Sequence, residues 1–230
     1  ECNKIMIHLS KTFLMLILLL LCATFEGTLS QGVMRKVTAG LFCKKPFTSC
    51  VRVNDNYKIP TPKNGQVLIK MSSSSVNPSD VDTVEMGGCL LGCGNDMAGV
   101  VFECNSCNRL KVGDLVWGFA NPSFADYVTV TEDQVSLRPT NVPTNQAGTI
   151  PEVGLTSLFS LKRTNIDISL PLPFGSPWSN RSNVTVVITA GSGGTGFIGI
   201  EIAIAYGATN IITSTTGAAA IAFVRSLGAT

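Results

Sequence analysis

Residues 184–216, VTVVITAGSGGTGFIGIEIAIAYGATNIITSTT, constrain the fold of this chain more than any other stretch. Residues 184–189 are β-branched and almost wholly apolar, as expected of a parallel strand buried on both faces. Glycines interrupt this run, an alanine- and isoleucine-rich segment typical of a buried helix follows, and residues 210–215 resemble a second strand. The sequence therefore predicts a strand, a glycine turn, a helix and a second strand.

The turn contains the pattern G-x-G-x-x-G, formed by Gly191, Gly193 and Gly196. In such a turn the first glycine allows a tight exit from the strand, the second lets the backbone approach a pyrophosphate, and the third lets helix and strand pack closely. The helix N-terminus adds free N–H groups and partial positive charge. We therefore predict a dinucleotide site with these candidate residues: Gly191, Ser192, Gly193, Gly194, Thr195 and Gly196. A glycine turn with only a packing role is the alternative.

Two other phosphate or nucleophile motifs do not fit this loop. A P-loop needs a lysine after the glycines, whereas Phe197 and Ile198 follow Gly196. A nucleophile elbow centred on Ser192 needs a histidine, and the single histidine is His8, near the start of the chain. The formal net charge of +2, without a long basic run, gives no reason to expect nucleic acid as a partner.

Residues 1–30 read as a signal-peptide region, with Lys11 before an apolar run over 13–21 and small or polar residues up to Ser30. The run is shorter than the ~20 residues of a comfortable membrane span, so no stable span is expected after signal removal. A retained signal anchor is the alternative. We predict a location in the secretory pathway, either lumenal or secreted.

Of the eight cysteines, Cys2 and Cys22 lie in or before the leader, which leaves six. An even number in a secreted chain favours disulfides, and we predict local pairs such as Cys43–Cys50 and Cys104–Cys107. A zinc site built from Cys89-x3-Cys93 and Cys104-x2-Cys107 is the alternative. The sequons at Asn180 and Asn183, in a proline-rich insertion over 164–183, predict a glycoprotein if the leader functions.

The segment from residue 33 to residue 141 shows many short strands separated by turn signals. Strands are predicted over 65–70, 97–103, 115–118 and 126–130. Gly113-Asp114 is a hairpin-turn signal between two of them. Many short strands with few helices indicate a small β-barrel or sandwich.

Eight phrases follow one another in an order that resembles the medium-chain dehydrogenase/reductase superfamily. They are IPTPKNGQVLIKM, VNPSDVD, NDMAGVV, LKVGDLVWGF, SFADYVTV, TIPEVGLTSLFSL, VVITAGSGGTG and FVRSLGAT. Within the family they resemble the zinc-independent quinone oxidoreductase-like branch, which includes enoyl and alkenal reductases. The resemblance implies an α/β plus β fold, with a GroES-like β-barrel domain over 31–150 and the first part of a Rossmann domain over 151–230.

The resemblance also implies roles for three residues. The family phrase Asn-Pro-x-Asp is present as Asn77 to Asp80, so Asn77 is expected near the nicotinamide and Asp80 is expected to orient the loop; a simple turn at Asn77-Pro78 is the alternative. Thr156 matches a threonine that helps to bind nicotinamide or phosphates, or is a helix-surface residue. Zinc-using relatives have cysteine in place of Asn77 and Gly-His-Glu in place of Gly94-Asn95-Asp96, so no catalytic zinc is expected.

The end of the second predicted strand distinguishes NADPH from NADH. An acidic residue there binds the ribose 2′-hydroxyl and repels a 2′-phosphate. This chain has neutral donors instead, Ser214, Thr215 and Thr216, which favours NADPH. NADH is the alternative, because Ala220 occupies the position of a lysine that the family's NADPH users often have.

By resemblance, the chain is an NADPH-dependent oxidoreductase that transfers hydride to a quinone or an activated carbon–carbon double bond, without zinc. Its expected partner is a small-molecule substrate, with a homodimer expected of the full-length protein. Thr230 ends the sequence where the family enters its third Rossmann strand, so a fragment of a longer product is expected, and a truncated relative is the alternative. The competing function is a secreted, non-catalytic GroES-like module that has lost cofactor binding.

Overall fold

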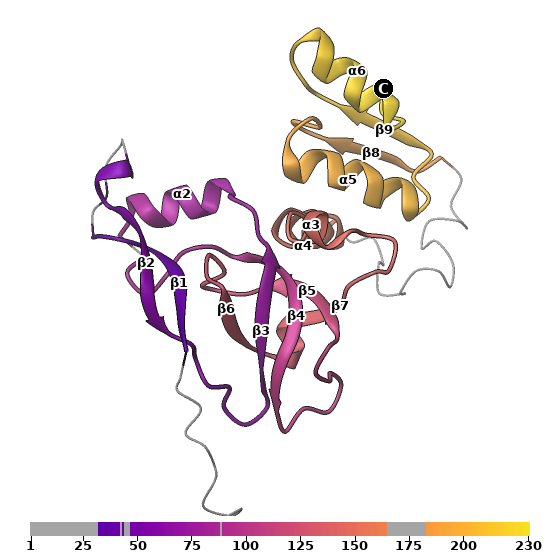
Figure 1. Cartoon of the computed structure of the whole chain (residues 1–230). Helices are drawn as coiled ribbons and strands as arrows, with labels where there is room; N and C mark the ends of the chain where they lie inside the picture. Colours follow the sequence, from indigo (N-terminus) through magenta and orange to yellow (C-terminus); the bar gives the residue numbers. More distant parts are fainter. Residues whose placement is uncertain (1–31, 42, 44–46, 88, 165–182) are drawn as a thin grey trace, which may run out of the picture.

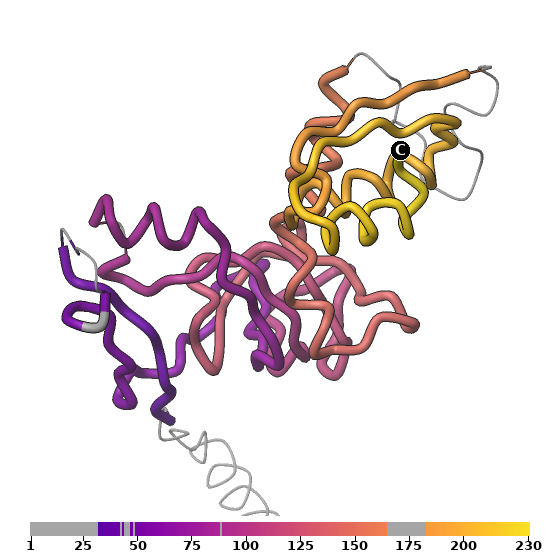
Figure 2. Tube along the Cα trace, turned by 90° about the horizontal axis from the view of Figure 1, so that it is seen from above, coloured from indigo at the N-terminus to yellow at the C-terminus, as the bar shows by residue number. Residues whose placement is uncertain are grey.

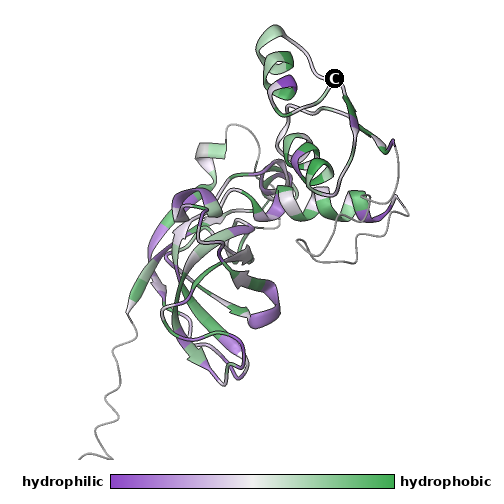
Figure 3. Ribbon diagram, turned by 90° about the vertical axis from the view of Figure 1, so that its right-hand side faces the viewer, coloured by the Kyte–Doolittle hydropathy of each residue, from purple (hydrophilic) through white to green (hydrophobic). Residues whose placement is uncertain are grey.

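The computed structural model describes residues 32–41, 43, 47–87, 89–164 and 183–230. A β-rich part comes first along the chain and an α/β part follows it (Figure 1). Seen from above, the two parts lie side by side and meet near the middle of the molecule (Figure 2). The colouring by hydropathy shows apolar residues along the helices of the α/β part, whereas outer turns of the β-rich part are hydrophilic (Figure 3).

The β-rich part is organised around a five-stranded antiparallel sheet of order β6-β3-β4-β5-β7. Its strands are β3 (Gln66–Ser73), β4 (Asp96–Asn105), β5 (Leu115–Phe119), β6 (Tyr127–Thr131) and β7 (Val135–Leu137). The four predicted strands are thus present, with ends that shift by a few residues. Side chains on one face, including Val67, Ile69 and Met97, are completely buried and form the core. Leu68 and Ala98, which alternate with them along β3 and β4, are buried as well, so the middle of the sheet is covered on both faces.

A second, two-stranded antiparallel sheet joins β1 (Val33–Ala39) to β2 (Val51–Lys58). A bridge between Lys36 and Ala125 connects β1 to the segment before β6. Helix α2 (Pro78–Glu85) lies beside this sheet (Figure 1). The sequence signal for α2 is Asn-Pro-x-Asp, with asparagine as N-cap, proline at the first helical position and an acidic residue in the first turn. Asn77 therefore begins a helix and is not part of a simple turn.

The six cysteines beyond the predicted leader form three local disulfides, Cys43–Cys50, Cys89–Cys93 and Cys104–Cys107. Their Cα–Cα separations of 5.9, 5.1 and 5.8 Å are ordinary for disulfides. Both predicted pairs are present. The first two disulfides pack in one apolar cluster around Ala39, whereas the third packs against the sheet core. The alternative zinc site is therefore wrong for this structure, because its two cysteine pairs lie in different clusters.

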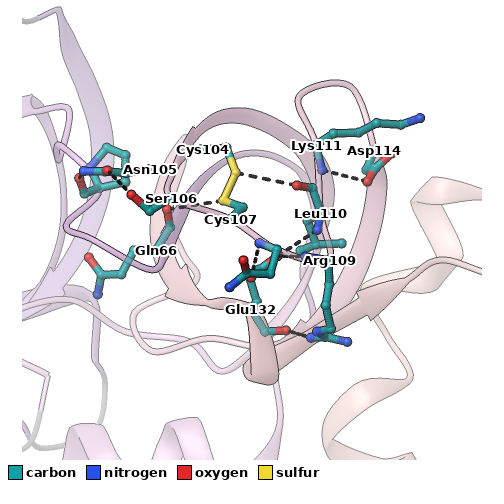
Figure 4. Close-up of a disulfide and its surroundings, with 12 residues drawn as sticks. Gln66, Cys104, Asn105, Ser106, Cys107, Arg109, Leu110, Lys111, Asp114 and Glu132 are labelled. Carbon is teal, nitrogen blue, oxygen red and sulfur yellow. Dashed lines mark hydrogen bonds between the residues drawn. A yellow bond between two sulfur atoms is a disulfide. The ribbon is translucent and has the colours of Figure 1, made fainter.

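The predicted turn at Gly113-Asp114 is present, but it does not form a tight hairpin. It ends a longer connection over residues 106–114 between β4 and β5. The carboxylate of Glu132 binds this connection by accepting the backbone N–H groups of Asn108, Arg109 and Leu110 at 2.9, 2.8 and 2.7 Å. Figure 4 shows Glu132 beside the Cys104–Cys107 disulfide, so a covalent bond and a carboxylate fix the same loop.

The α/β part contains the predicted order of strand, glycine turn, helix and strand. Strand β8 (Thr185–Ile188) pairs in parallel with β9 (Asn210–Thr213), and α5 (Gly194–Ala205) runs between them in sequence. Helix α4 (Pro151–Lys162) packs against α5. The short helix α3 (Thr144–Ala147) precedes α4, and α6 (Ala218–Ser226) follows β9.

The expectation that the first strand is buried on both faces is wrong for this structure. Val186 is buried, but Val187, which points to the opposite face, is 69% exposed, and Ile212 on β9 is 48% exposed. Within the part of the chain that the structure describes, α5 contacts β8 and no element with comparable contact covers the other face. The second strand also ends earlier than predicted, at Thr213, so that Ser214 and Thr215 belong to the following loop.

Candidate functional site

The glycine turn lies at the carboxyl end of β8 and leads directly into α5. A Cβ atom on Gly191 would lie 2.1 Å from Thr213 Oγ1, and one on Gly196 would lie 2.2 Å from the carbonyl oxygen of Ala190. Side chains are excluded at both positions, because the turn packs against β9 and against itself. At Gly193 the nearest atom would be 3.3 Å away, so this position is much less crowded by the protein.

The residues around Gly193 leave the start of α5 accessible, although the Gly193 N–H itself donates to the Ala190 carbonyl at 2.9 Å. Gly193 is the N-cap of α5, and Ser192, Gly193, Gly194 and Thr195 are all exposed. The first N–H groups of an α-helix have no acceptor within the helix. Together with the positive end of the helix dipole, they form a site that suits a phosphate group. The residues present therefore fit the pyrophosphate of a dinucleotide.

The loop after β9 meets this turn through hydroxyl groups. Ser214 Oγ accepts the backbone N–H of Ala190 at 3.1 Å. The hydroxyl groups of Ser192 and Thr215 lie 2.5 Å apart, which joins the two loops across the open end of the sheet. Thr216, the third residue predicted to bind cofactor, is exposed in the same loop. These side chains are neutral donors and acceptors, so they add no charge that would repel a phosphate.

Helix α4 is joined to the glycine turn by Ser157, a residue that sequence analysis did not identify. Ser157 is buried, and its hydroxyl lies 2.7 Å from both the Val153 and the Thr195 carbonyl oxygens. A cavity of about 430 Å³ lies alongside, lined by residues of α4, β8 and the glycine turn. Thr156 does not line this cavity: it is exposed, and its hydroxyl donates to the Glu152 carbonyl one turn earlier at 2.7 Å.

A second group of site residues lies where β3, β4, α2 and α4 come together. Asn77 is only 7% exposed, and its side-chain nitrogen donates to Asp96 Oδ2 at 2.8 Å and to Ser75 Oγ at 3.3 Å. Its backbone N–H donates to Asp80 Oδ2 at 2.7 Å. The other oxygen of Asp80 accepts the side-chain amide of Asn95 at 3.2 Å. Asp80 therefore fixes the N-terminus of α2 and the loop before β4.

Asp96 is the centre of this second group and was not predicted as a site residue. It is completely buried at the start of β4. Besides Asn77, it accepts the hydroxyl of Ser75 at 2.5 Å and the backbone N–H of Glu152 at 2.6 Å. One carboxylate thus joins the loop after β3 to the first turn of α4. The only sequence signal is its place after Gly94-Asn95, where zinc-using relatives have glutamate.

The pKa of Asp80 is raised above its ordinary value, mainly because burial disfavours the charged carboxylate. The hydrogen bond from the Asn77 backbone opposes this shift, and the negative charges of Glu152 and Asp96 add to it. Glu152 reaches this cluster through its side chain, which accepts the hydroxyl of Ser79. Its second oxygen, Oε2, is buried and has no hydrogen-bond partner among the described residues. Among the described residues, no group of three potential ligands is arranged to hold a metal ion.

The two groups are linked through α4, which carries both Glu152 and Ser157. These positions are five residues apart, or about 7.5 Å along a helix axis. A largely apolar cavity of about 690 Å³ also lies between the β-rich and α/β parts, and its lining includes Trp117, Phe119, Leu155, Ile202 and Tyr206. The junction thus contains open space of the size that small-molecule sites have.

Comparison with known proteins supports the predicted architecture. Residues 63–143 match the model of the alcohol dehydrogenase GroES-like domain. The chain is 32% identical over 187 residues to a chloroplast envelope quinone oxidoreductase homolog of Arabidopsis thaliana, covering 74% of this chain and 53% of that protein. It is 28% identical over 163 residues to the mitochondrial NAD(P)H oxidoreductase RTN4IP1 of Dictyostelium discoideum, covering 63% of this chain and 42% of that protein.

Among solved structures, the quinone oxidoreductase from Coxiella burnetii superposes with a TM-score of 0.68 at 28% identity, covering 86% of this chain and 61% of that chain. The chain spans about half the length of the curated relatives that it matches. The predicted fold class, a GroES-like domain followed by the first part of a Rossmann domain, is confirmed. The predicted boundary at residue 150 stays a prediction.

The predicted location in the secretory pathway is wrong. The names of the matched relatives assign them to the mitochondrion and the chloroplast envelope, which points away from that pathway. The signal-peptide region and the sequon at Asn180 lie outside the described residues. Within the described part of the chain, no helix has the length and apolar character needed to cross a bilayer.

Proposed function

Because the chain belongs to the medium-chain dehydrogenase/reductase superfamily, in its quinone oxidoreductase-like branch, we propose that it binds a nicotinamide dinucleotide. We propose further that the protein is an NAD(P)H-dependent oxidoreductase. The relatives named NAD(P)H oxidoreductase and quinone oxidoreductase homolog support this class of reaction. We assign substrate positioning to the GroES-like domain over 31–150 and cofactor binding to the Rossmann part over 151–230.

The observation that carries the proposal is the exposed backbone from Ser192 to Thr195 at the N-terminus of α5. A turn with only a packing role needs no exposed helix N-terminus, whereas a pyrophosphate needs one. Gly193 leaves room for a phosphate, since even a methyl group there would meet only one backbone oxygen, at 3.3 Å.

We propose NADPH as the preferred cofactor. The loop that follows β9 has hydroxyl side chains at Ser214, Thr215 and Thr216, and a 2′-phosphate would accept hydrogen bonds from them. A carboxylate at this place would favour NADH instead. The pairing of Ser192 with Thr215 at 2.5 Å supports this assignment, because it gathers hydroxyl donors at one point beside the turn.

When bound, the cofactor would supply a hydride, and the acceptor would be a quinone or an activated carbon–carbon double bond. Asn77 is proposed to contact the nicotinamide or the substrate, and Asp80 to hold Asn77 through its backbone N–H. The position that is cysteine in zinc-using relatives is Asn77 here, so the proposed reaction uses no zinc. Thr156, on the exposed face of α4, is proposed to contact the nicotinamide or the phosphates. The main contribution of these residues to hydride transfer is to position the reacting groups.

The test is NADPH binding by the purified chain, measured by quenching of NADPH fluorescence. We expect binding by the wild type and its loss in Gly193→Asp, because a carboxylate would occupy the pyrophosphate position. Asn210→Asp is the matched control, since it adds the same charge at the other end of the parallel sheet, where β9 begins. Failure of the folded wild type to bind either NADPH or NADH would instead favour a non-catalytic GroES-like module.

A further inference from the structure

The Cys104–Cys107 disulfide is the only one in the described part of the chain without a buried cysteine. Each of the other two bonds has at least one buried cysteine, namely Cys43, Cys89 or Cys93. Cys104 and Cys107 are only half-buried, and the two residues between them are exposed. The rate of thiol–disulfide exchange depends on access to a sulfur atom. A thiol in solution therefore reaches this bond more easily than the other two.

The two cysteines have the spacing C-x-x-C over residues 104–107. With this spacing, one cysteine can attack a mixed disulfide at the other, because only two residues separate them. Outside an oxidising compartment such a pair is more typical of a redox or metal site than of a structural bond. The predicted secretory location, which would have explained a structural bond, is wrong. Among the described residues, no third potential ligand joins the pair to form a metal site.

The fold around the pair suits the reduced form as well as the disulfide. The Cys104 sulfur lies 3.6 Å from the Leu110 carbonyl oxygen, and the Cys107 sulfur lies 3.9 Å from the Gln66 carbonyl oxygen (Figure 4). A disulfide has no proton to donate, whereas each thiol of a reduced pair is a weak donor. Both thiols would therefore find an acceptor without a movement of the backbone.

The connection between β4 and β5 keeps its anchor when the bond opens. The Glu132 carboxylate accepts the backbone N–H groups of residues 108–110, and none of these contacts involves a sulfur atom. Ser106, inside the loop that the bond closes, has a φ of 57°, a left-handed conformation that residues other than glycine adopt rarely. Opening the bond allows Ser106 to leave this conformation. The oxidised and reduced forms thus differ locally, at residues 104–107.

We propose that Cys104 and Cys107 form a redox-active pair that undergoes thiol–disulfide exchange with a dithiol. A thiolate of the dithiol attacks one of the two sulfur atoms, the Cys104–Cys107 bond breaks, a mixed disulfide forms, and the released thiolate takes up a proton. The second thiolate of the dithiol then attacks the dithiol's own sulfur in the mixed disulfide, and the other cysteine leaves and is protonated. The pair gains two electrons and two protons, and the dithiol becomes an intramolecular disulfide.

This exchange does not depend on the proposed function. Cys104 lies near the end of β4, whereas Asp96, in the proposed substrate and nicotinamide region, is the first residue of the strand. The redox pair and the glycine turn also belong to different parts of the fold. A chain that binds no dinucleotide would contradict the proposed function and leave this inference intact.

The test compares the reduction of the disulfides in the folded full chain. The chain is treated with dithiothreitol at neutral pH without denaturant, alkylated with iodoacetamide at intervals, and analysed by peptide mass spectrometry. We expect Cys104 and Cys107 to be alkylated together, about tenfold faster or more than the Cys89–Cys93 pair. That pair is the internal control, because both of its cysteines are buried. A Cys104–Cys107 bond that opens no faster than the control overturns the inference.

The exchange is also expected to be reversible and to leave the fold intact. After removal of the reductant, oxidised glutathione should restore the Cys104–Cys107 bond in the wild type. Cys107→Ser should instead stop at a mixed disulfide of glutathione with Cys104, because no second cysteine resolves it. On reduction, the backbone amide signals of residues 104–107 should move, while those of residues 108–110 stay in place. Loss of the amide dispersion of the whole β-rich part would show that reduction unfolds it, and would overturn the inference.

A second reductant identifies the source of the dithiol. Pre-reduced thioredoxin replaces dithiothreitol in the same alkylation experiment. Opening of the Cys104–Cys107 bond by thioredoxin at a lower concentration than dithiothreitol requires would assign the exchange to a protein dithiol. Opening by dithiothreitol alone would assign it to a small dithiol. Resistance of the bond to both reductants in the folded chain overturns the inference.

Discussion

The side-chain nitrogen of Asn77 lies 2.8 Å from the carboxylate of Asp96, nineteen residues further along the chain. Asn77 is the N-cap of α2, and Asp96 is the first residue of β4. Because Asp96 also accepts the backbone N–H of Glu152, this contact connects the GroES-like sheet to the helix that leads into the nucleotide-binding part. Loss of the contact between Asn77 and Asp96 is expected to weaken this junction and to change the geometry of the site.

Replacing Asp96 by alanine is expected to destabilise the protein by about 3 kcal/mol, because three buried or part-buried donors lose their acceptor at once. The donors belong to Asn77, Ser75 and Glu152. Asp96→Asn keeps one acceptor and is expected to be milder. Urea denaturation checks the order of the two variants. Equal midpoints for Asp96→Ala and the wild type would show that the buried carboxylate is not needed for stability.

A methyl group at Gly191 is expected to destabilise the α/β part. Its Cβ would lie 2.1 Å from Thr213 Oγ1, a hydroxyl that donates to the Ile188 carbonyl at 2.6 Å, so the contact between the two strands must shift. We expect Gly191→Ala to reduce the free energy of unfolding by about 1–3 kcal/mol. Gly193→Ala is the matched control, with a nearest contact of 3.3 Å and a smaller expected effect. If the control were the more destabilised variant in thermal unfolding, the packing role of Gly191 would be refuted.

These glycines show what sequence reasoning can reach. The order of β8, the glycine turn and α5 follows from a local pattern of β-branched, glycine and apolar residues, and the structure has it. The strand predicted over residues 65–70 is likewise present, as Gln66–Ser73. The start of α2 had an equally local signal at Asn77-Pro78, which could have been read from capping preferences.

Other features depend on contacts that no local pattern encodes. The partners of Asp96 come from the loop after β3 and from α4, and their convergence depends on how β3, β4 and α4 are packed. Ser157 resembles any polar residue on a helix until α5 is packed against it. The exposure of Val187 could not be predicted either, since an apolar strand does not reveal which of its faces a helix covers.

The carboxylate of Glu132 is expected to make the stability of the β4–β5 connection depend on pH. Its pKa is lowered, first of all by the hydrogen bond from the Asn108 backbone, with further contributions from Arg109 and Leu110. A depressed native pKa means that the stabilisation is present above the unfolded-state pKa and is lost as pH falls through the native one. Glu132→Gln should therefore be less stable than wild type at pH 7, and the difference should shrink in acid.

The matched control for this experiment is Glu103→Gln, which neutralises an exposed carboxylate on β4. Urea midpoints of all three proteins between pH 7 and pH 3 give the comparison. A constant gap between wild type and Glu132→Gln over this range would contradict the assigned role of the carboxylate.

The Cys104–Cys107 disulfide closes a short loop with a sequence separation of 3. In the chain-entropy description, a disulfide that closes such a loop stabilises a protein by about 2 kcal/mol, because it restricts the unfolded chain. The double variant Cys104→Ser/Cys107→Ser should lose about this amount in chemical denaturation under oxidising conditions. The double variant Cys43→Ser/Cys50→Ser provides a comparison. Equal denaturation midpoints for the wild type and Cys104→Ser/Cys107→Ser would show that the Cys104–Cys107 bond adds no stability.

Cofactor preference is expected to respond to charge in the loop after β9. In the wild type, the hydroxyl groups of Ser192 and Thr215 lie 2.5 Å apart. Thr215→Asp places a carboxylate beside Ser192, and this charge would repel a 2′-phosphate. We expect the ratio of NADPH to NADH affinity to fall at least tenfold, mainly through weaker NADPH binding. Titration of both cofactors provides an internal control, because an equal loss for the two would indicate a general disturbance of the turn.

The most direct test of the account follows the backbone amide signals of the ¹⁵N-labelled chain during titration with NADPH. The account predicts that the largest shifts occur at Ser192, Gly193, Gly194, Thr195 and Gly196, at the N-terminus of α5. Signals from the far end of the sheet, such as Thr185 and Asn210, should remain in place. A folded chain whose glycine-turn amides do not respond to saturating NADPH or NADH would contradict the central claim that this turn binds the cofactor's pyrophosphate.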